Sequence, residues 1–81
     1  MSKYEKFLVD YIIEKNGIDI NSININNNMF EQGYIDSLGI FTLFVLIEEE
    51  FDIDMSLDDV ANFNIKTIKQ LAQFIQSKSV L

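Results

Sequence analysis

The sequence predicts an all-α fold: a four-helix bundle with a long first loop and a short third helix. Apolar residues recur at steps of three and four along most of the chain, which is the spacing of one helix face. Capping residues stand where these periodic segments begin. The one alternating segment, 18–25, has no second strand with which to pair. We expect helices at about 3–15, 37–51, 56–62 and 65–77, within a single domain spanning 1–81.

The first helix and the loop after it carry clear boundary signals. Ser2 and Glu5 have the spacing of a capping box, and Asn16-Gly17 supplies a left-handed residue that ends the helix after Lys15. The apolar face is formed by Tyr4, Phe7, Leu8, Tyr11 and Ile12. The chain then runs to Ile35 as a long loop, in which the asparagine-rich tract 21–28 favours turns. We expect this loop to be pinned by Ile23, Ile25, Met29 and Phe30.

The later helices also follow from caps and periodicity. Asp36-Ser37 opens the second helix, whose core-facing stripe is Ile40, Leu43, Phe44, Ile47 and Phe51. Ser56 and Asp59 form a capping box for a short third helix that ends near Phe63. Asn64 is the expected cap of the fourth helix, which turns Ile68, Leu71, Ala72 and Ile75 inward. We expect the tail 78–81 to fray.

Composition excludes several classes of function. The chain has no cysteine and no histidine, so it has neither a thiolate nor a ready base at neutral pH, and thiol chemistry has to be imported. Six basic residues stand against thirteen acidic ones, giving a net charge of −7. This charge excludes nucleic-acid binding and favours partners with basic surfaces.

No segment of the sequence predicts a membrane protein. The longest apolar stretch, 38–47, has about half the roughly 20 residues that cross a bilayer. The amino-terminal residues carry both signs of charge and lead directly into a helical pattern, unlike a secretion signal. We therefore expect a cytoplasmic monomer without membrane insertion.

The acidic cluster after the second helix does not match a calcium-binding loop. An EF-hand needs alternating acids followed by a glycine and ends on a glutamate. Here Ser56 and Leu57 stand where the last acid and the glycine belong and Phe63 stands at the end, so we predict no metal site among Asp52, Asp54, Asp58 and Asp59. Loose surface binding of divalent cations is the remaining alternative.

The segment Gly33-Tyr34-Ile35-Asp36-Ser37-Leu38 is the most informative part of the chain. A flexible glycine and two apolar anchors precede an acid and a hydroxyl at a helix start. By residue types alone, helix capping is the favoured interpretation. Hydrolysis by Ser37 is excluded as its role, because no histidine is present to act as base and no Gly-x-Ser-x-Gly elbow surrounds it.

From about Tyr4 to Ile75 the chain resembles the acyl and peptidyl carrier proteins. The resemblance is centred on Met29 to Leu38 and continues through Leu43, the run Glu48-Glu49-Glu50-Phe51, and Ile53. It implies the acyl-carrier four-helix bundle and a 4′-phosphopantetheine arm attached to Ser37. It also implies that Asp36 contacts the phosphopantetheinyl transferase in addition to capping the helix.

The resemblance implies a carrier that is not itself an enzyme. Ser37 attacks the pyrophosphate of coenzyme A while the transferase supplies the base and metal, and the arm brings the missing thiol. A phosphodiester on Ser37 would lie at the amino end of the second helix, where unpaired N–H groups and the helix dipole favour an anion. The other implied partners are an acyl- or aminoacyl-activating ligase and a downstream transferase with basic surfaces.

Two departures from fatty-acid carriers influence the expected cargo. Such carriers usually have acids where this chain has Gly39 and Thr42, and Gly-Tyr-Ile-Asp-Ser-Leu is more similar to carriers of amino acids, including D-alanyl carriers, and of specialised acyl groups. We therefore expect an aminoacyl or specialised acyl carrier. The alternatives are a carrier of general fatty-acid synthesis and an acidic helical adaptor without a cofactor.

The second helix has a second apolar face, formed by Leu38, Phe41 and Val45. One interpretation is that the long loop folds over this face and buries it. The favoured hypothesis is that the face stays exposed and forms the apolar centre of a docking surface. Glu48 and Glu49 would be its charged rim, and the small residues Gly39 and Thr42 would allow a partner to approach closely.

Overall fold

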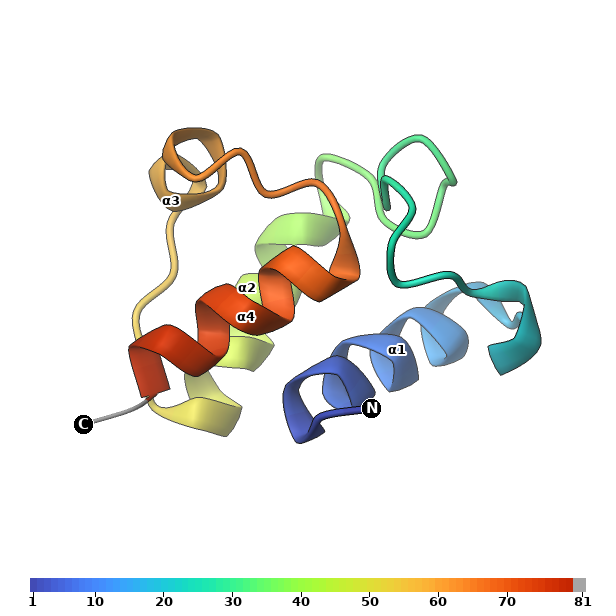
Figure 1. Ribbon diagram of the computed structural model, residues 1–81, viewed down its shortest axis with the longest axis horizontal. Helices are drawn as coiled ribbons and strands as arrows, with labels where there is room; N and C mark the ends of the chain where they lie inside the picture. The colour runs from blue at the N-terminus through green and yellow to red at the C-terminus, as the bar shows by residue number, and fades with distance from the viewer. Residues whose placement is uncertain (80–81) are drawn as a thin grey trace.

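Four α-helices and one 3-10 turn make up the regular structure of residues 1–79, which the computed structural model describes (Figure 1). They are α1 (Lys3–Asn16), η1 (Ile20–Ser22), α2 (Gly39–Phe51), α3 (Leu57–Asn62) and α4 (Ile68–Ser79). Within the described residues the only strand-like pairing is a single bridge between Asn28 and Thr67. The predicted all-α bundle with a long first loop and a short third helix is confirmed.

The predicted caps of α1 are both present. The Ser2 hydroxyl accepts a hydrogen bond from the Glu5 amide at 3.1 Å, and the Glu5 carboxylate accepts one from the Ser2 amide at 2.8 Å. Gly17 adopts a left-handed φ of 64° and donates its N–H to the Ile13 carbonyl at 2.8 Å. Because a glycine takes this conformation without steric cost, it ends the helix one residue later than the sequence predicted.

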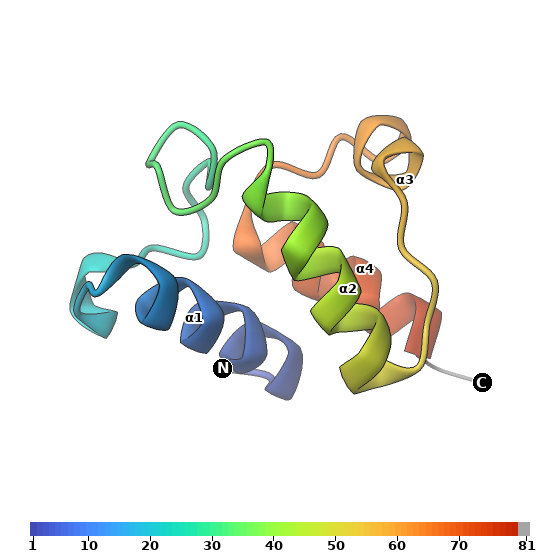
Figure 2. The ribbon, with the colours of Figure 1, turned by 180° about the vertical axis from the view of Figure 1, so that it is seen from behind.

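One apolar core joins the three long helices. α1 and α4 pack directly against each other, and the view from behind shows α2 crossing the bundle between α1 and α3 (Figure 2). Four residues of the expected core stripe of α2 are buried: Ile40, Leu43, Phe44 and Ile47. The fifth, Phe51, is half-buried, and its ring centroid lies 5.0 Å from that of Tyr4 and 5.2 Å from that of Phe7. The fully buried side chains are Leu8, Val9, Ile12, Met29, Leu43, Ile47, Ile68, Leu71 and Ile75.

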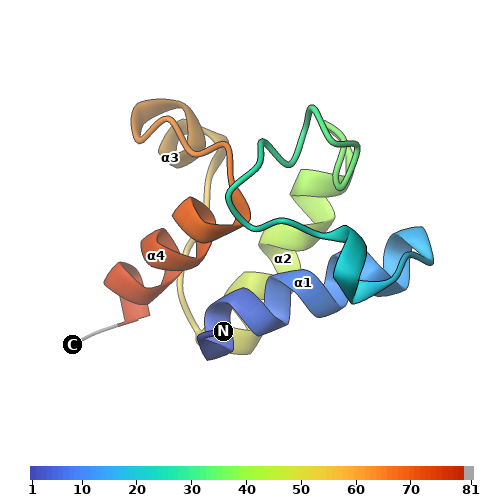
Figure 3. The same ribbon diagram turned by 45° about the vertical axis from the view of Figure 1, so that its right-hand side comes forward.

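The loop between α1 and α2 curls over one end of the bundle and is built from side-chain-capped turns (Figure 3). Asp19 accepts from the amide of Asn21, and Asn24 accepts from the amide of Asn26. Asn28 accepts from the amides of Phe30 and Glu31. Short polar side chains that bond the backbone two or three residues on explain why an asparagine-rich tract forms turns. The 3-10 turn η1 belongs to this pattern and was not predicted.

Met29 is the residue that anchors this loop. Its side chain is fully buried, its amide donates to the Lys66 carbonyl at 2.8 Å, and its carbonyl accepts from the Tyr34 amide at 2.9 Å. Ile23 and Ile25 are half-buried against the core. The expectation that Phe30 also pins the loop is wrong, since its side chain is exposed. The neighbouring backbone is instead held by the Asn28 side chain.

The second and fourth helices begin later than predicted. α2 begins at Gly39 instead of residue 37; Leu38 precedes it without a side-chain capping bond, and the Asp36 carboxylate accepts from the Gly39 amide. α4 begins at Ile68 instead of residue 65, where Thr67 accepts from the Gln70 amide at 3.0 Å and the Gln70 side chain accepts from the Thr67 amide at 3.1 Å. The predicted cap Asn64 instead adopts a left-handed φ of 51° after α3. The chain stays extended before Thr67 because this segment pairs with the loop at Met29 and Asn28.

The short helix α3 starts at the predicted capping box and is held against α4. Ser56 and Asp59 exchange both hydrogen bonds of the box, so that α3 itself begins at Leu57. Phe63 stacks on Phe74 with ring centroids 5.2 Å apart. Lys78 lies 3.3 Å from the Asp59 carboxylate and also donates to the Asp54 carbonyl. Fraying from Lys78 onward is therefore wrong for residues 78 and 79, which are helical, and residues 80–81 lie outside the described part of the chain.

Lys78→Met tests whether this contact holds α3 in place. The side chains of Lys78 and Asp59 are 31% and 24% exposed, so the variant should lose about 1 kcal/mol of unfolding free energy. For a domain of this size that corresponds to a melting temperature about 4–8 °C lower, measured by circular dichroism. Lys66→Met, at an exposed lysine without an ion pair in residues 1–79, is the matched control. Equal losses in the two variants would contradict the assignment.

Candidate cofactor-attachment site

The segment around Ser37 is positioned by two buried side chains. Gly33 adopts a left-handed φ of 74°, which allows the chain to turn back toward the core. Tyr34 and Ile35 are then buried, and both of their amides donate to the Met29 carbonyl. Asp36, Ser37 and Leu38 come next and lie on the surface. Burial of the two residues just before this stretch therefore fixes where Ser37 leaves the core.

The end of α1 also holds this segment. The Asn16 side-chain amide donates to the Tyr34 carbonyl at 2.8 Å and to the Ile12 carbonyl at 3.1 Å. The sequence indicated Asn16 only as part of a helix stop, and this second role was missed. An asparagine at a helix end gives no local signal of a partner eighteen residues away.

Asp36 provides the cap of α2. Its carboxylate accepts from the Gly39 amide at 2.6 Å, and its carbonyl accepts from the Ile40 amide at 3.1 Å. These are the bonds of an N-cap residue, so Ser37 lies within the capping turn, just before the helix. Ser37 is exposed, and its hydroxyl has no hydrogen-bond partner among residues 1–79. Residue types alone favoured capping by both Asp36 and Ser37, and of the two only the Asp36 side chain bonds an amide of α2 among residues 1–79.

The amide groups at this helix end are less available to an anion than expected. Asp36 occupies the amides of Gly39 and Ile40, and the Phe41 amide donates to the Leu38 carbonyl at 3.2 Å. The Asp36 carboxylate also brings a negative charge to this helix end. The expectation that unpaired amides of this turn receive the phosphate is therefore wrong for these three groups.

A cavity of about 360 Å³ lies beside Ser37. It is bounded by the end of α1 and by the segment that carries the serine. Its lining residues are Lys15, Asn16, Phe30, Gly33, Tyr34, Ile35, Asp36 and Ser37. Lys15 is the only cationic residue among them.

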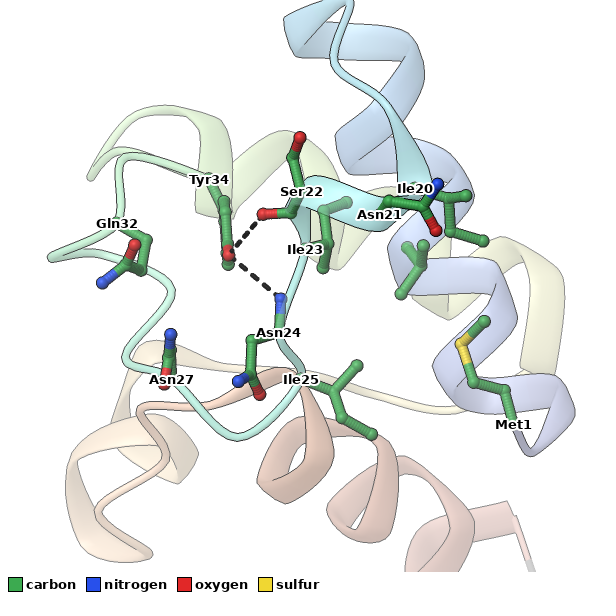
Figure 4. A pocket seen from close by; sticks show the side chains of 11 residues that line it. Met1, Ile20, Asn21, Ser22, Ile23, Asn24, Ile25, Asn27, Gln32 and Tyr34 are labelled. Atoms are coloured by element: carbon green, nitrogen blue, oxygen red, sulfur yellow. Dashed lines mark hydrogen bonds between the residues drawn. The ribbon is translucent and has the colours of Figure 1, made fainter.

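A second cavity, of about 510 Å³, lies between the long loop and the amino-terminal part of the chain, where Met1 and Val9 line it, and does not include Ser37 (Figure 4). The Tyr34 hydroxyl stands at its wall, where it donates to the Ser22 carbonyl and accepts from the Asn24 amide, both at 3.1 Å. Tyr34 therefore connects the loop to the segment that presents Ser37. The sequence identified it only as an apolar anchor.

The second apolar face of α2 is exposed. Leu38 is 77% exposed, Phe41 47% and Val45 51%. The alternative in which the long loop covers this face is wrong, because Met29, Tyr34 and Ile35 direct their side chains into the core instead. Leu57 and Phe63 of the neighbouring α3 segment are exposed as well.

The two glutamates assigned to the rim of this face differ in their surroundings. Glu49 is exposed, whereas Glu48 is half-buried and accepts from the Met55 amide at 2.8 Å. That bond ties the loop after α2 to the helix. Glu48 therefore has a hydrogen-bond partner within the protein, although a negative charge near the carboxyl end of a helix interacts unfavourably with the helix dipole.

Gly39 does not contribute to an open docking face. It is buried, and a Cβ atom built on it would lie 2.9 Å from the Asp36 carboxylate, 3.2 Å from Ile35 and 3.5 Å from Lys15 Cε. The expectation that Gly39 lets a partner approach closely is wrong. The absent side chain instead leaves room for the Asp36 cap and for the Lys15 stem.

Neither a metal cluster nor a membrane span is found in the described part of the chain. Across residues 1–79 no three acidic side chains are grouped so as to hold a metal ion. None of the helices in this range is long and apolar enough to cross a membrane.

Comparison with known proteins identifies the family. Residues 6–75 match the family model for a phosphopantetheine attachment site. An acyl carrier protein of Trieres chinensis is 33% identical over 82% of this chain and 80% of its own length, and one of Bdellovibrio bacteriovorus is 29% identical over 85% and 86%. A D-alanyl carrier protein of Bacillus cereus is 30% identical over 73% of this chain and 75% of its own length. The chain therefore belongs to the phosphopantetheine-dependent carrier proteins, whose covalently attached prosthetic group is 4′-phosphopantetheine.

Proposed function

We propose that Ser37 is the attachment residue and that the chain holds an aminoacyl or specialised acyl cargo as a thioester. The observation that carries the proposal is the exposed Ser37 hydroxyl in the turn before α2, which has no hydrogen-bond partner within residues 1–79. When bound, 4′-phosphopantetheine supplies the thiol that a chain without cysteine lacks.

The residues around Ser37 suit this group. The hydroxyl is free to reach a transferase, and the backbone behind it is fixed by the buried side chains of Tyr34 and Ile35. The adjoining cavity of about 360 Å³ has Lys15 in its wall, a cation suited to a phosphodiester. The chain itself binds and positions the group, and the phosphopantetheinyl transferase supplies the base that removes the Ser37 proton. On this proposal the carrier catalyses no step itself.

Two observations support the choice of cargo. Gly39 and Thr42 stand where fatty-acid carriers usually have acids, and any side chain at position 39 would place its Cβ 2.9 Å from the Asp36 carboxylate, so that one of the two would have to shift. One of the relatives is named a D-alanyl carrier protein. The relatives named acyl carrier protein favour the second candidate, a carrier of general fatty-acid synthesis. The family match argues against the adaptor without a cofactor.

Leu38, Phe41 and Val45 form the apolar centre of the proposed docking surface for partner enzymes. We assign Glu49 to its charged rim, and Glu48 to both the rim and the internal bond to Met55. The partners are the transferase, a ligase that loads the cargo, and a downstream transferase. Their basic surfaces would complement the net charge of −7.

Ser37→Ala should abolish modification by a broad-specificity phosphopantetheinyl transferase with coenzyme A, as measured by intact mass. Because Asp36 caps the helix, this variant should keep its melting temperature, with a change in stability within about 0.5 kcal/mol. Ser22→Ala and Ser56→Ala are the controls and should be modified normally. A folded Ser37→Ala protein that still gains the mass of the arm would reject the site.

Phe41→Glu separates a docking residue from a core residue. Losing the burial of Phe41 at an interface should weaken transferase binding by roughly ten- to a hundred-fold, from a loss of about 1.5–3 kcal/mol. The melting temperature should be unchanged or higher, because Phe41 is half exposed. Gln73→Glu, on an exposed position of α4, adds the same charge elsewhere and should bind normally. A large fall in the melting temperature of Phe41→Glu would refute the docking assignment.

The association rate with the transferase should fall as ionic strength rises from about 0.01 M to 0.15 M, where the screening length shortens from about 30 to 8 Å. The physical reason is attraction between the acidic carrier and a basic partner. Glu49→Gln should reduce the rate at low salt without changing the fold, since Glu49 is exposed. Rates independent of salt in stopped-flow measurements would mean that the acidic run is only a solvated face.

A further inference from the structure

We propose that the cavity beside Ser37 is the seat of the phosphodiester end of the arm, and that the Lys15 ammonium binds the phosphate there. This inference rests on the proposed attachment at Ser37. It adds a second, non-covalent contact between the chain and its prosthetic group, made from the end of α1.

The charges around Ser37 favour such a contact. The Asp36 carboxylate lies in the same cavity wall, and it already occupies the first amide of α2. A phosphodiester on Ser37 adds a second negative charge beside it, and like charges at short range repel. The net charge of −7 makes the wider field unfavourable as well. A nearby cation would offset both the repulsion between Asp36 and the phosphodiester and the unfavourable field of the net negative charge.

Lys15 is placed to act as that cation. It is the only basic residue that lines the cavity, and it forms no ion pair with another side chain in residues 1–79. Two of the other five lysines are already engaged: Lys6 pairs with Asp10 and Lys78 with Asp59.

The aliphatic stem of Lys15 lies beside Gly39, at the start of α2. The point at which a Cβ of residue 39 would stand is 3.5 Å from Lys15 Cε and 2.9 Å from the Asp36 carboxylate. A larger side chain at position 39 would compete for the space that the Lys15 stem and the cap share. The terminal methylene of Lys15 therefore lies close to Gly39, and Lys15 and Ser37 line the same cavity.

The cavity also suits the part of the arm beyond the phosphate. The pantoyl part of the arm carries two methyl groups, and Phe30 supplies an exposed aromatic surface in the same wall. Phe30 does not pin the loop as the sequence predicted, and its exposed ring has no packing role in the core. Contact with the arm would bury part of it.

The experiment compares the melting temperatures of the apo and phosphopantetheinylated forms of the full chain at low ionic strength. We expect attachment to lower the melting temperature of Lys15→Met by about 2–5 °C more than that of the unchanged chain, the effect of losing one exposed ion pair in a small domain. The apo variant corrects for any effect of Lys15 on the fold itself. Lys15→Arg retains the cation and should behave like the unchanged chain.

Lys69→Met is the matched control. Lys69 lines a separate pocket with Ser2 and Glu5 at the opposite end of α1, so its loss should not alter the response to attachment. The difference between Lys15→Met and the unchanged chain should vanish near 1 M salt, where screening acts over about 3 Å. In ³¹P spectra of the modified proteins, the phosphodiester signal should shift on Lys15→Met and not on Lys69→Met.

Two outcomes would overturn the inference in different ways. If mass spectrometry shows no modification of Ser37, the proposed function fails and this inference fails with it. If Ser37 is modified but Lys15→Met responds to attachment as the unchanged chain and Lys69→Met do, the attachment site stands and the Lys15 contact is rejected. An equal response of Lys15→Met and Lys69→Met, both different from the unchanged chain, would also reject a specific contact and indicate only general electrostatics.

Discussion

The geometry around Ser37 depends on the burial of Tyr34 and Ile35. Both side chains enter the core and both amides bond the Met29 carbonyl, so the chain is immobilised just before it reaches the surface. Asn16 and the Tyr34 hydroxyl extend this anchor to α1 and to the long loop. The serine can therefore be fully accessible to an enzyme while the backbone that carries it stays in place. On the proposed attachment at Ser37, this fixed backbone matters because the position of Ser37 sets the region that the attached arm can reach.

α2 combines two requirements that oppose each other in a small domain. Its stripe from Ile40 to Ile47 has to be buried, because a domain of about 80 residues has little other apolar surface with which to stabilise its fold. Its other face keeps Phe41 and Val45 half exposed, which lowers solubility without adding stability. The glutamates at the end of this helix, together with the strongly negative net charge, counter self-association of such a face. An apolar face beside an acidic run is thus favourable for transient contact with basic partners and unfavourable for contact with a second copy.

Features that depend on a few neighbouring residues could be predicted from the sequence, and features that depend on distant residues could not. The capping pairs Ser2–Glu5 and Ser56–Asp59 and the stop at Gly17 are local, and all three are present. The start of α4 was misplaced because residues 65–67 are held extended by the loop at Met29, a partner far along the chain. For the same reason, the residues next to Lys78 and Asn16 in the sequence did not indicate that Lys78 is held in α4 or that Asn16 bonds the Tyr34 carbonyl. Within the site, the sequence identified Asp36 and Ser37 together, but only the structure separates their roles: Asp36 bonds the Gly39 amide, and the Ser37 hydroxyl has no partner in residues 1–79.

Gly39 shows how one position connects the fold, the cap and the charge at the site. It is buried, so the absence of a side chain is a matter of packing and not of partner access. The space is shared by a carboxylate that starts α2 and by the stem of a lysine that ends α1, so the two helix ends meet at this residue. The cation at the end of α1 is favourable for the dipole of that helix and lies close to the amino end of the next. A carrier with an acid at position 39 would have to place the Asp36 carboxylate and the Lys15 side chain differently. Through the Asp36 carboxylate, a side chain at position 39 would therefore change the electrostatics beside Ser37, the proposed attachment residue, from within the packed interior.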